Sequence, residues 1–313
     1  MTGSVLTLEN VSRDFTAAGK RRLRAVDGVS LALGGGETLG IVGESDCGKS
    51  TLARLTLKLI PVTQGRIGLL GRDITDLSAR AMRPLRKHLQ AVFQDPVSSL
   101  NPRWRVSEII AEPLRQSDLG RRAVAERARE MLALVGLPPD SAGRFPHAFS
   151  GGQRQRIAIA RALAAEPRIL ICDEATSALD VSVQAQILNL LAELQERLSL
   201  SVIFISHNLG AVRHVSARVA VMYLGRIVEE AGEADLFDRP LHPYTHALLD
   251  AVPEPVLNQT RSAPLAGEIP SAADRPPACH FHPRCPRAQT ICRTEDPLLR
   301  DIGGRKVRCH FPG

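Results

Sequence analysis

Short apolar runs alternate with longer amphipathic stretches along most of the chain. Strand-like runs occupy residues 26–33, 38–42, 169–172 and 202–206, and helical periodicity covers residues 51–60, 122–135, 153–165 and 181–198. Alternation of buried strands with amphipathic helices is typical of a largely parallel sheet covered by helices. The pattern therefore predicts an α/β domain over residues 1–235 and, since regular periodicity ends near that point, a small C-terminal appendage over residues 236–313.

Composition narrows the class of protein. The chain has 313 residues, of which 44% are hydrophobic, enough for a sizeable core. A net charge of +7 admits nucleic acid, anionic membranes or phosphorylated ligands as partners. Because aromatic residues make up only 4% and are not interleaved with the basic residues, we expect no nucleic-acid partner. No apolar run reaches membrane-spanning length, and the N-terminal segment is too charged for a signal peptide, so we expect a cytosolic chain.

The stretch GESDCGKST directly follows the apolar run 38–42 and precedes a helical pattern. Its glycine, lysine and serine spacing is that of a phosphate-binding loop, in which backbone amides wrap the phosphates, the lysine reaches the outer ones and the serine binds magnesium. The start of the following helix adds a positive dipole end. The predicted nucleotide-binding loop consists of Gly43, Glu44, Ser45, Asp46, Cys47, Gly48, Lys49, Ser50 and Thr51.

A second element, ILICDEA at residues 169–175, places two carboxylates at the end of a buried strand. Ligands bind at the carboxyl ends of strands in open sheets of this kind. Asp173 suits the magnesium shell, and Glu174 suits polarising the water that attacks a terminal phosphate. A plain acidic turn is the alternative, and the phosphate loop in the same chain disfavours it.

A third element, FSGGQRQR at residues 149–156, opens another long helix. Ser150, Gly151, Gly152 and Gln153 offer amides and a hydroxyl to an anion, but no lysine. The chain thus has two half-sites for phosphate. If the second cannot reach the nucleotide on its own loop, a second chain facing it head to tail completes both sites.

These motifs, in this order, resemble the ATP-binding cassette (ABC) family over essentially the first 235 residues. The resemblance implies a P-loop NTPase cassette with a mixed, largely parallel sheet and a helical signature subdomain. It also implies roles for Gln94 as the glutamine that contacts magnesium or water and senses the permease, for residues 177–180 (SALD) as the loop that crosses between subunits, and for His207 as the switch histidine at the terminal phosphate. Phe15 is the candidate for stacking on adenine. A capping or core histidine and an ordinary buried phenylalanine are the alternatives.

The tail resembles a narrower group. HPYT at residues 242–245 and GEIPSAADRPPACHFHPRC at 267–285 look like the C-terminal extension of ATPases that serve oligopeptide and dipeptide importers, whose relatives carry nickel and other small solutes. The stretches at residues 92–103 and 144–163 point the same way. The resemblance implies an ATP-hydrolysing subunit, peripheral on the cytoplasmic face of the inner membrane. Its implied partners are two permease subunits, a second ATPase subunit, identical or paralogous, and an extracytoplasmic solute-binding protein.

Four cysteines cluster in the tail, with histidines beside them: Cys279, Cys285, Cys292 and Cys309. Four soft ligands in a reducing compartment suit zinc or an iron–sulfur cluster, and the absence of a CxxC pair weakens the zinc-ribbon interpretation. The family resemblance implies a 4Fe–4S cluster on these four positions, with four unliganded thiols as the alternative. We expect Cys47 and Cys172 to be small buried side chains.

Position 46 departs from the family pattern, which has glycine there. Asp46 tolerates the positive φ of such a loop, but its charge opposes phosphate. Three outcomes are open: a side chain turned to solvent, weakened ATP binding, or a pair with Lys49 that closes the empty site. Our hypothesis is weakened binding with hydrolysis retained or reduced. Two other functions stay open, a regulatory cassette disabled by Asp46 and a soluble ABC ATPase acting on nucleic acid.

Overall fold

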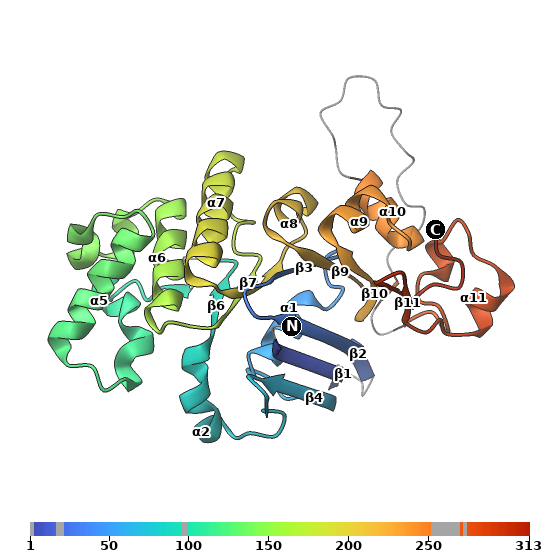
Figure 1. Ribbon diagram of the computed structural model, residues 1–313, viewed down its shortest axis with the longest axis horizontal. Helices are drawn as coiled ribbons and strands as arrows, with labels where there is room; N and C mark the ends of the chain where they lie inside the picture. The colour runs from blue at the N-terminus through green and yellow to red at the C-terminus, as the bar shows by residue number, and fades with distance from the viewer. Residues whose placement is uncertain (1–2, 17–21, 96–98, 252–269, 272–273) are drawn as a thin grey trace. The chain divides into compact units, whose positions relative to one another are not determined.

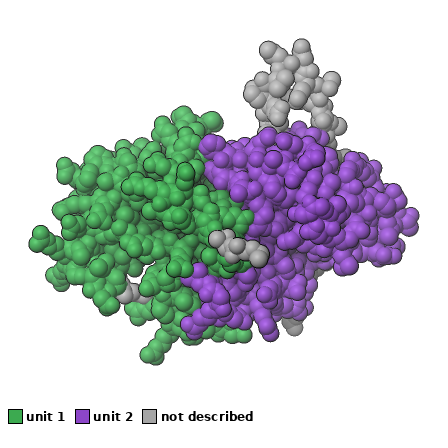
Figure 2. Space-filling model, viewed as in Figure 1, with its two compact units in different colours: residues 1–5, 33–38, 76–205 green, residues 6–32, 39–75, 206–313 purple. Residues whose placement is uncertain are grey.

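The chain forms two compact units in a computed structural model that describes residues 3–16, 22–95, 99–251, 270–271 and 274–313. Unit 1 comprises residues 1–5, 33–38 and 76–205, and unit 2 comprises residues 6–32, 39–75 and 206–313 (Figure 2). The stretches at 92–103 and 267–285 lie partly outside the described residues. The predicted boundary between residues 235 and 236 stays a prediction.

Unit 1 carries three parallel strands and the helices of the signature region (Figure 1). β6 (Leu89–Phe93) pairs with β7 (Ile169–Asp173), which pairs with β8 (Ser201–Ile205), both pairings being parallel. All residues of β7 and β8 are buried, because parallel strands are covered on both faces. The helical elements are α2 (Ala79–Met82), η1 (Arg83–His88), α4 (Val106–Ile110), η2 (Glu112–Gln116), α5 (Arg121–Leu134), η3 (Pro139–Gly143), η4 (Pro146–Ala148), α6 (Gly151–Ala164) and α7 (Val181–Leu198).

The helical part of unit 1 packs around α6. α5 lies against α6 and buries Ala128, Met131 and Leu132, the apolar face of an amphipathic helix. α6 in turn approaches α7 closely, since a Cβ on Gly152 would lie 2.3 Å from a methyl group of Val183. α6, the helix that follows Ser150, is therefore packed against both α5 and α7.

Unit 2 carries two sheets. β1 (Ser4–Thr16), β2 (Arg22–Gly34), β4 (Gln64–Leu69) and β5 (Arg72–Asp73) form a four-stranded sheet in the order β2-β1-β4-β5. In the other sheet β3 (Thr38–Val42) runs parallel to β9 (Arg218–Tyr223), and β10 (Arg226–Gly232), β12 (Arg305–Val307) and β11 (Arg300–Ile302) continue it with antiparallel pairings. The helical elements are α1 (Lys49–Thr56), α8 (Leu209–Val215), α9 (Glu233–Asp238), α10 (Pro243–Asp250), η5 (His282–Arg284) and α11 (Thr290–Thr294).

The expected fold class is confirmed, and the predicted elements agree closely with the structure. The helix predicted over residues 51–60 is shorter, since α1 ends at Thr56 and Lys58 has a left-handed φ of 54°. The tail was expected to have few regular elements. It nevertheless adds β12 to the edge of β10, so the C-terminal residues extend the sheet that carries β3 and the phosphate loop.

Candidate functional site

The phosphate loop connects β3, which ends at Val42, to α1, which begins at Lys49. Gly43 and Gly48 both have positive φ, 156° and 106°. A Cβ would lie 2.2 Å from the carbonyl oxygen of Met222 at Gly43 and 2.3 Å from that of Ala25 at Gly48. Only glycine fits at these positions, because any side chain would collide with backbone.

Lys49 is buried, with 5% of its surface exposed. Its Nζ donates hydrogen bonds to the carbonyl oxygens of Gly43 at 2.8 Å and Glu44 at 2.7 Å. The ammonium group is thereby folded back over the loop whose amides are expected to hold phosphate. A buried cation satisfied by carbonyls is held at a defined position, which suits a group that must meet a phosphate oxygen.

Asp46 has a left-handed φ of 60°, and its side chain is exposed. Among the described residues no ion pair joins it to Lys49, whose printed partners lie elsewhere on the loop. The loop instead borders a pocket of about 420 Å³, lined by Leu23, Glu44, Ser45, Asp46, Cys47, Tyr223, Leu224, Pro270 and Ser271. The structure thus gives no support to the closed loop among the three outcomes, and it leaves the other two open.

His207 also belongs to unit 2, between β8 and α8. Its side chain is exposed, and the helix cap is made by Asn208, whose Oδ1 accepts from the amide of Ala211 at 3.1 Å. His207 is therefore neither a core residue nor the cap of α8. Phe15 on β1 is half-buried, with the guanidinium of Arg13 4.7 Å from its ring centre.

In unit 1 the two carboxylates and the glutamine lie at the same edge of the sheet. Phe93 of β6 is paired with Asp173 of β7, so Gln94 and Glu174 follow directly at the ends of neighbouring parallel strands. Asp173 is buried, Glu174 is half-buried and Gln94 is exposed. Glu174 has a left-handed φ of 51°, and its amide donates to the carbonyl oxygen of Ile205 at 2.9 Å. Such a backbone conformation is uncommon for a residue other than glycine, and it occurs directly after the last residue of β7.

The signature motif forms a self-contained helix start. Ser150 Oγ accepts from the amide of Gln153 at 3.4 Å, and Gln153 Oε1 accepts from the amide of Ser150 at 3.0 Å, which is a capping box. Ser150, Gly151 and Gln153 are exposed. Asp180 caps α7 in the same unit, and hydrogen bonds from the amide of Val183 and the Ser182 hydroxyl lower the pKa of its carboxyl.

The four tail cysteines line one pocket, together with residues that include His282 and His310. Across the described part of the chain, however, no group of three or more His, Cys, Asp or Glu side chains is placed to hold a metal ion. The iron–sulfur expectation is thus not supported among the described residues. Burial raises the pKa of the Cys279 thiol to about 11 and also raises the pKa values of the Cys285 and Cys309 thiols. A zinc site, in which four ligands bind one ion tetrahedrally, is also not supported among the described residues.

The two remaining cysteines are small buried side chains, as expected. Cys47 and Cys172 are both buried. Burial raises the pKa of Cys172 to about 12 and raises that of Cys47, so neither is a reactive thiolate.

Comparisons with known proteins agree with this geometry. Residues 26–177 match the ABC transporter family, and residues 228–292 match the family described as oligopeptide/dipeptide transporter, C-terminal region. The chain belongs to the ABC transporter family and is an ATP-hydrolysing cassette of the type that drives importers.

Two curated relatives and one solved structure illustrate the match. The oligopeptide transport ATP-binding protein AppF of Bacillus subtilis (strain 168) is 51% identical, with 92% of this chain and 90% of the relative covered. The oligopeptide transport ATP-binding protein OppF of Escherichia coli (strain K12) is 49% identical, covering 92% and 88%. A dimeric post-hydrolysis structure of the ATP-binding cassette MJ0796 bound to ADP and phosphate matches with a TM-score of 0.66 at 29% identity, covering 73% and 98%.

The described helices include none that is long and apolar enough to span a membrane.

Proposed function

We propose that this chain is the ATP-hydrolysing subunit of an importer for peptides or a related small solute. The observation that carries the proposal is the buried Lys49 folded over a glycine-framed loop, in a chain whose C-terminal region matches that of oligopeptide and dipeptide transporters. The relatives named above are oligopeptide transport ATP-binding proteins, which supports a peptide as the solute.

The proposed nucleotide site uses the predicted residues in distinct roles. The amides of residues 43–51 and Lys49 bind the phosphates, and Phe15 stacks on adenine. Ser50, Gln94 and Asp173 hold magnesium, which neutralises phosphate charge when bound. Glu174 takes a proton from the attacking water, and His207 contacts the terminal phosphate.

The second helix start serves a nucleotide held by another copy or a paralogue. This helix start has no lysine, and three of its four residues are exposed: Ser150, Gly151 and Gln153. The related MJ0796 cassette is dimeric in its structure with ADP and phosphate. ATP would close the two cassettes head to tail, and hydrolysis would reopen them. The surface around Gln94 would pass that motion to two permease subunits.

These partners would place the chain on the cytoplasmic face of the inner membrane, where the permease holds it. An extracytoplasmic solute-binding protein delivers the peptide to the same permease. No nucleic-acid partner is part of the proposal.

The test is ATP turnover in the complete transporter with and without a panel of peptides on the binding protein. Peptide-stimulated turnover that disappears with Glu174→Gln supports the proposal. Turnover that Glu174→Gln does not change would favour the regulatory cassette. Salt-sensitive binding of nucleic acid by the pure chain, with no transporter partner, would favour the soluble ABC ATPase.

The cysteine pocket carries a separate proposal, a 4Fe–4S cluster on Cys279, Cys285, Cys292 and Cys309. In such a cluster each thiolate binds a different iron, so the sulfurs surround a volume and need not converge on one ion. The shared pocket supports this arrangement. Anaerobic purification with iron and sulfide analysis and a visible spectrum tests it. Colourless protein with stoichiometric zinc would overturn it.

A further inference from the structure

We infer that the C-terminal region positions the phosphate loop at Glu44, with Arg284 and Tyr244 as positioning residues for ATP. The inference deepens the proposed function, because it depends on residues 43–51 being the nucleotide site. All three residues belong to unit 2, although Arg284 and Glu44 are 240 positions apart in the sequence.

Arg284 grips the Glu44 carboxylate with two parallel hydrogen bonds. Its Nη1 lies 2.8 Å from Oε2 and its Nη2 lies 2.9 Å from Oε1. The side chains are 4% and 21% exposed, and the guanidinium carbon lies 5.9 Å from the ring centre of Tyr223. The hydrogen bonds to Glu44 raise the pKa of Arg284 above its ordinary value. A bidentate, largely buried guanidinium fork fixes both the position and the orientation of its carboxylate.

Tyr244 holds the backbone of the same residue. The amide of Glu44 donates to the Tyr244 hydroxyl at 2.9 Å, and the tyrosine is completely buried. Its ring packs 4.6 Å from that of Tyr223 and 5.5 Å from that of Phe281, centre to centre. His242 Nδ1 accepts from the amide of Tyr244 at 3.0 Å and so caps α10. Tyr244, the third residue of the HPYT motif, therefore directs its hydroxyl at the phosphate loop.

Glu44 is contacted by Tyr244 and Arg284 and also by Lys49. The carbonyl oxygen of Glu44 accepts from Lys49 Nζ, its amide is held by Tyr244 and its carboxylate by Arg284. Fixing Glu44 thus fixes a carbonyl against which the phosphate-binding ammonium lies. Arg284 also neutralises a carboxylate that would otherwise add negative charge beside the triphosphate.

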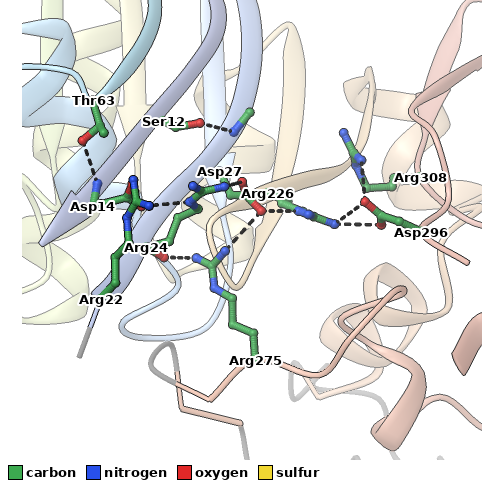
Figure 3. A network of polar contacts seen from close by, with 11 residues as sticks. Ser12, Asp14, Arg22, Arg24, Asp27, Thr63, Arg226, Arg275, Asp296 and Arg308 are labelled. Atoms are coloured by element: carbon green, nitrogen blue, oxygen red, sulfur yellow. Dashed lines mark hydrogen bonds and ion pairs between the residues drawn. The ribbon is translucent and has the colours of Figure 1, made fainter. Parts of the chain in front are cut away.

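The C-terminal region has a second attachment that keeps Arg284 in place. Arg275 and Arg226 both contact Asp27 of β2, and Arg226 makes two hydrogen bonds to Asp296 (Figure 3). Arg308 lies 4.0 Å from the same Asp296. Burial opposes ionisation of Asp27, but Arg226 and the other guanidinium groups lower its pKa, so the network stays charged. The tail is therefore fastened independently of the Glu44 contact.

The experiment measures Mg–ATP affinity and turnover for the full chain and four variants. Arg284→Gln leaves the Glu44 carboxylate unpaired, and we expect Mg–ATP to bind roughly ten-fold more weakly with a smaller change in kcat. Adding Glu44→Gln to Arg284→Gln removes the stray charge, and we expect affinity to return to within about three-fold of the original. Tyr244→Phe keeps the packing but removes the acceptor, and a loss of about three-fold is expected. Arg293→Gln, an exposed arginine of α11, is the control with the same charge change and no expected effect.

The outcomes separate this inference from the proposed function. Wild-type chain that binds no Mg–ATP contradicts both. If the wild-type chain binds Mg–ATP and neither Arg284→Gln nor Arg293→Gln changes that affinity, the inference is wrong and the proposed function stands. If the double variant is as weak as Arg284→Gln, Arg284 supports only the fold and the inference is wrong. Hydrogen exchange of amides 43–49 adds a direct readout, with faster exchange expected in Arg284→Gln and recovery in the double variant.

Discussion

The chain contains two helix starts suited to phosphate, at α1 and at α6 (Figure 1), and they are built in opposite ways. α1 begins after Gly48, which has no side chain with which to cap the helix, so its first amides are left for a ligand. α6 begins after Ser150, which forms a capping box with Gln153 and closes the helix end with its own side chains. The first start is braced from outside, by Tyr244 and Arg284, while the second is complete in itself and exposed.

In the proposed function, the two helix starts have different tasks. The start of α1 binds a nucleotide, and the start of α6 completes the site of a nucleotide bound by another chain. In that function, the loop with the buried Lys49 holds the nucleotide of its own chain. An exposed, self-capped start has no lysine and gains little from a nucleotide until another surface presents one. Variants at the start of α1 should therefore change the ATP affinity of the single chain, whereas variants at the start of α6 should change only the turnover of the assembled pair.

Glu174→Gln is expected to have the largest effect. General-base contributions are worth about 10²- to 10⁴-fold, so turnover should fall by that factor while Mg–ATP affinity stays near normal. Turnover in the assembled transporter and ATP binding to the single chain check this. Normal turnover of Glu174→Gln would mean that the site of this chain does not hydrolyse ATP. The comparison of two working half-sites would then be wrong.

Lys49→Ala removes the cation of the braced start. Loss of one charge-stabilising group costs about 10²- to 10³-fold in turnover, and ATP affinity of the single chain should fall as well. Equilibrium binding of Mg–ATP measures the second effect. The neighbouring exposed residue Arg54 of α1 offers a control, since Arg54→Ala removes a cation at the other end of the helix.

Ser150→Ala tests the self-capped start. In the proposed pair the Ser150 hydroxyl offers a hydrogen bond to the other chain's nucleotide, and since such a bond is worth about 1 kcal/mol, we expect roughly five-fold slower turnover in the assembled pair. ATP affinity of the single chain should not change. A loss of single-chain affinity would show that α6 serves the nucleotide of its own chain, contrary to the head-to-tail arrangement.

Asp46→Gly should have an effect of about the same size as Ser150→Ala, but as a gain in ATP affinity. Removing an exposed carboxylate near phosphate is worth about 1 kcal/mol, so Mg–ATP should bind roughly five-fold more tightly. Asp46→Asn separates charge from backbone freedom, because asparagine also tolerates positive φ. Equal affinity of all three versions would mean that Asp46 points away and that the loop is an ordinary ATP site.

The strands and helices could be predicted because each has a local cause. α7 agrees with its prediction at both ends, since Asp180 caps its start and apolar periodicity runs to Leu198. The glycines of the phosphate loop have equally local steric reasons. The helix after the loop was predicted too long, because propensity continued past Leu57 where the chain had already turned at Lys58.

Glu44 shows what could not be predicted. The sequence identifies Glu44 only as one of the nine residues of the phosphate loop. It identifies HPYT only as part of the resemblance to a family, with no role for its tyrosine. No periodic pattern in the sequence indicates that Tyr244 or Arg284 contacts Glu44, because these residues are far apart along the chain. The one available hint was a carboxylate inside an anion-binding loop, which calls for a cation to neutralise it.

The sequence by itself determined the α/β cassette, the glycine-framed loop, the carboxylates at the end of β7 and the helix start at Ser150, because steric rules, periodicity and short-range hydrogen bonds act between neighbours in the chain. Only the tertiary structure decided that the C-terminal region extends the sheet through β12 and holds Glu44 through Tyr244 and Arg284. The physical reason is that an ion pair or a buried hydroxyl chooses its partner by proximity in the folded chain, and that proximity arises only when distant elements pack.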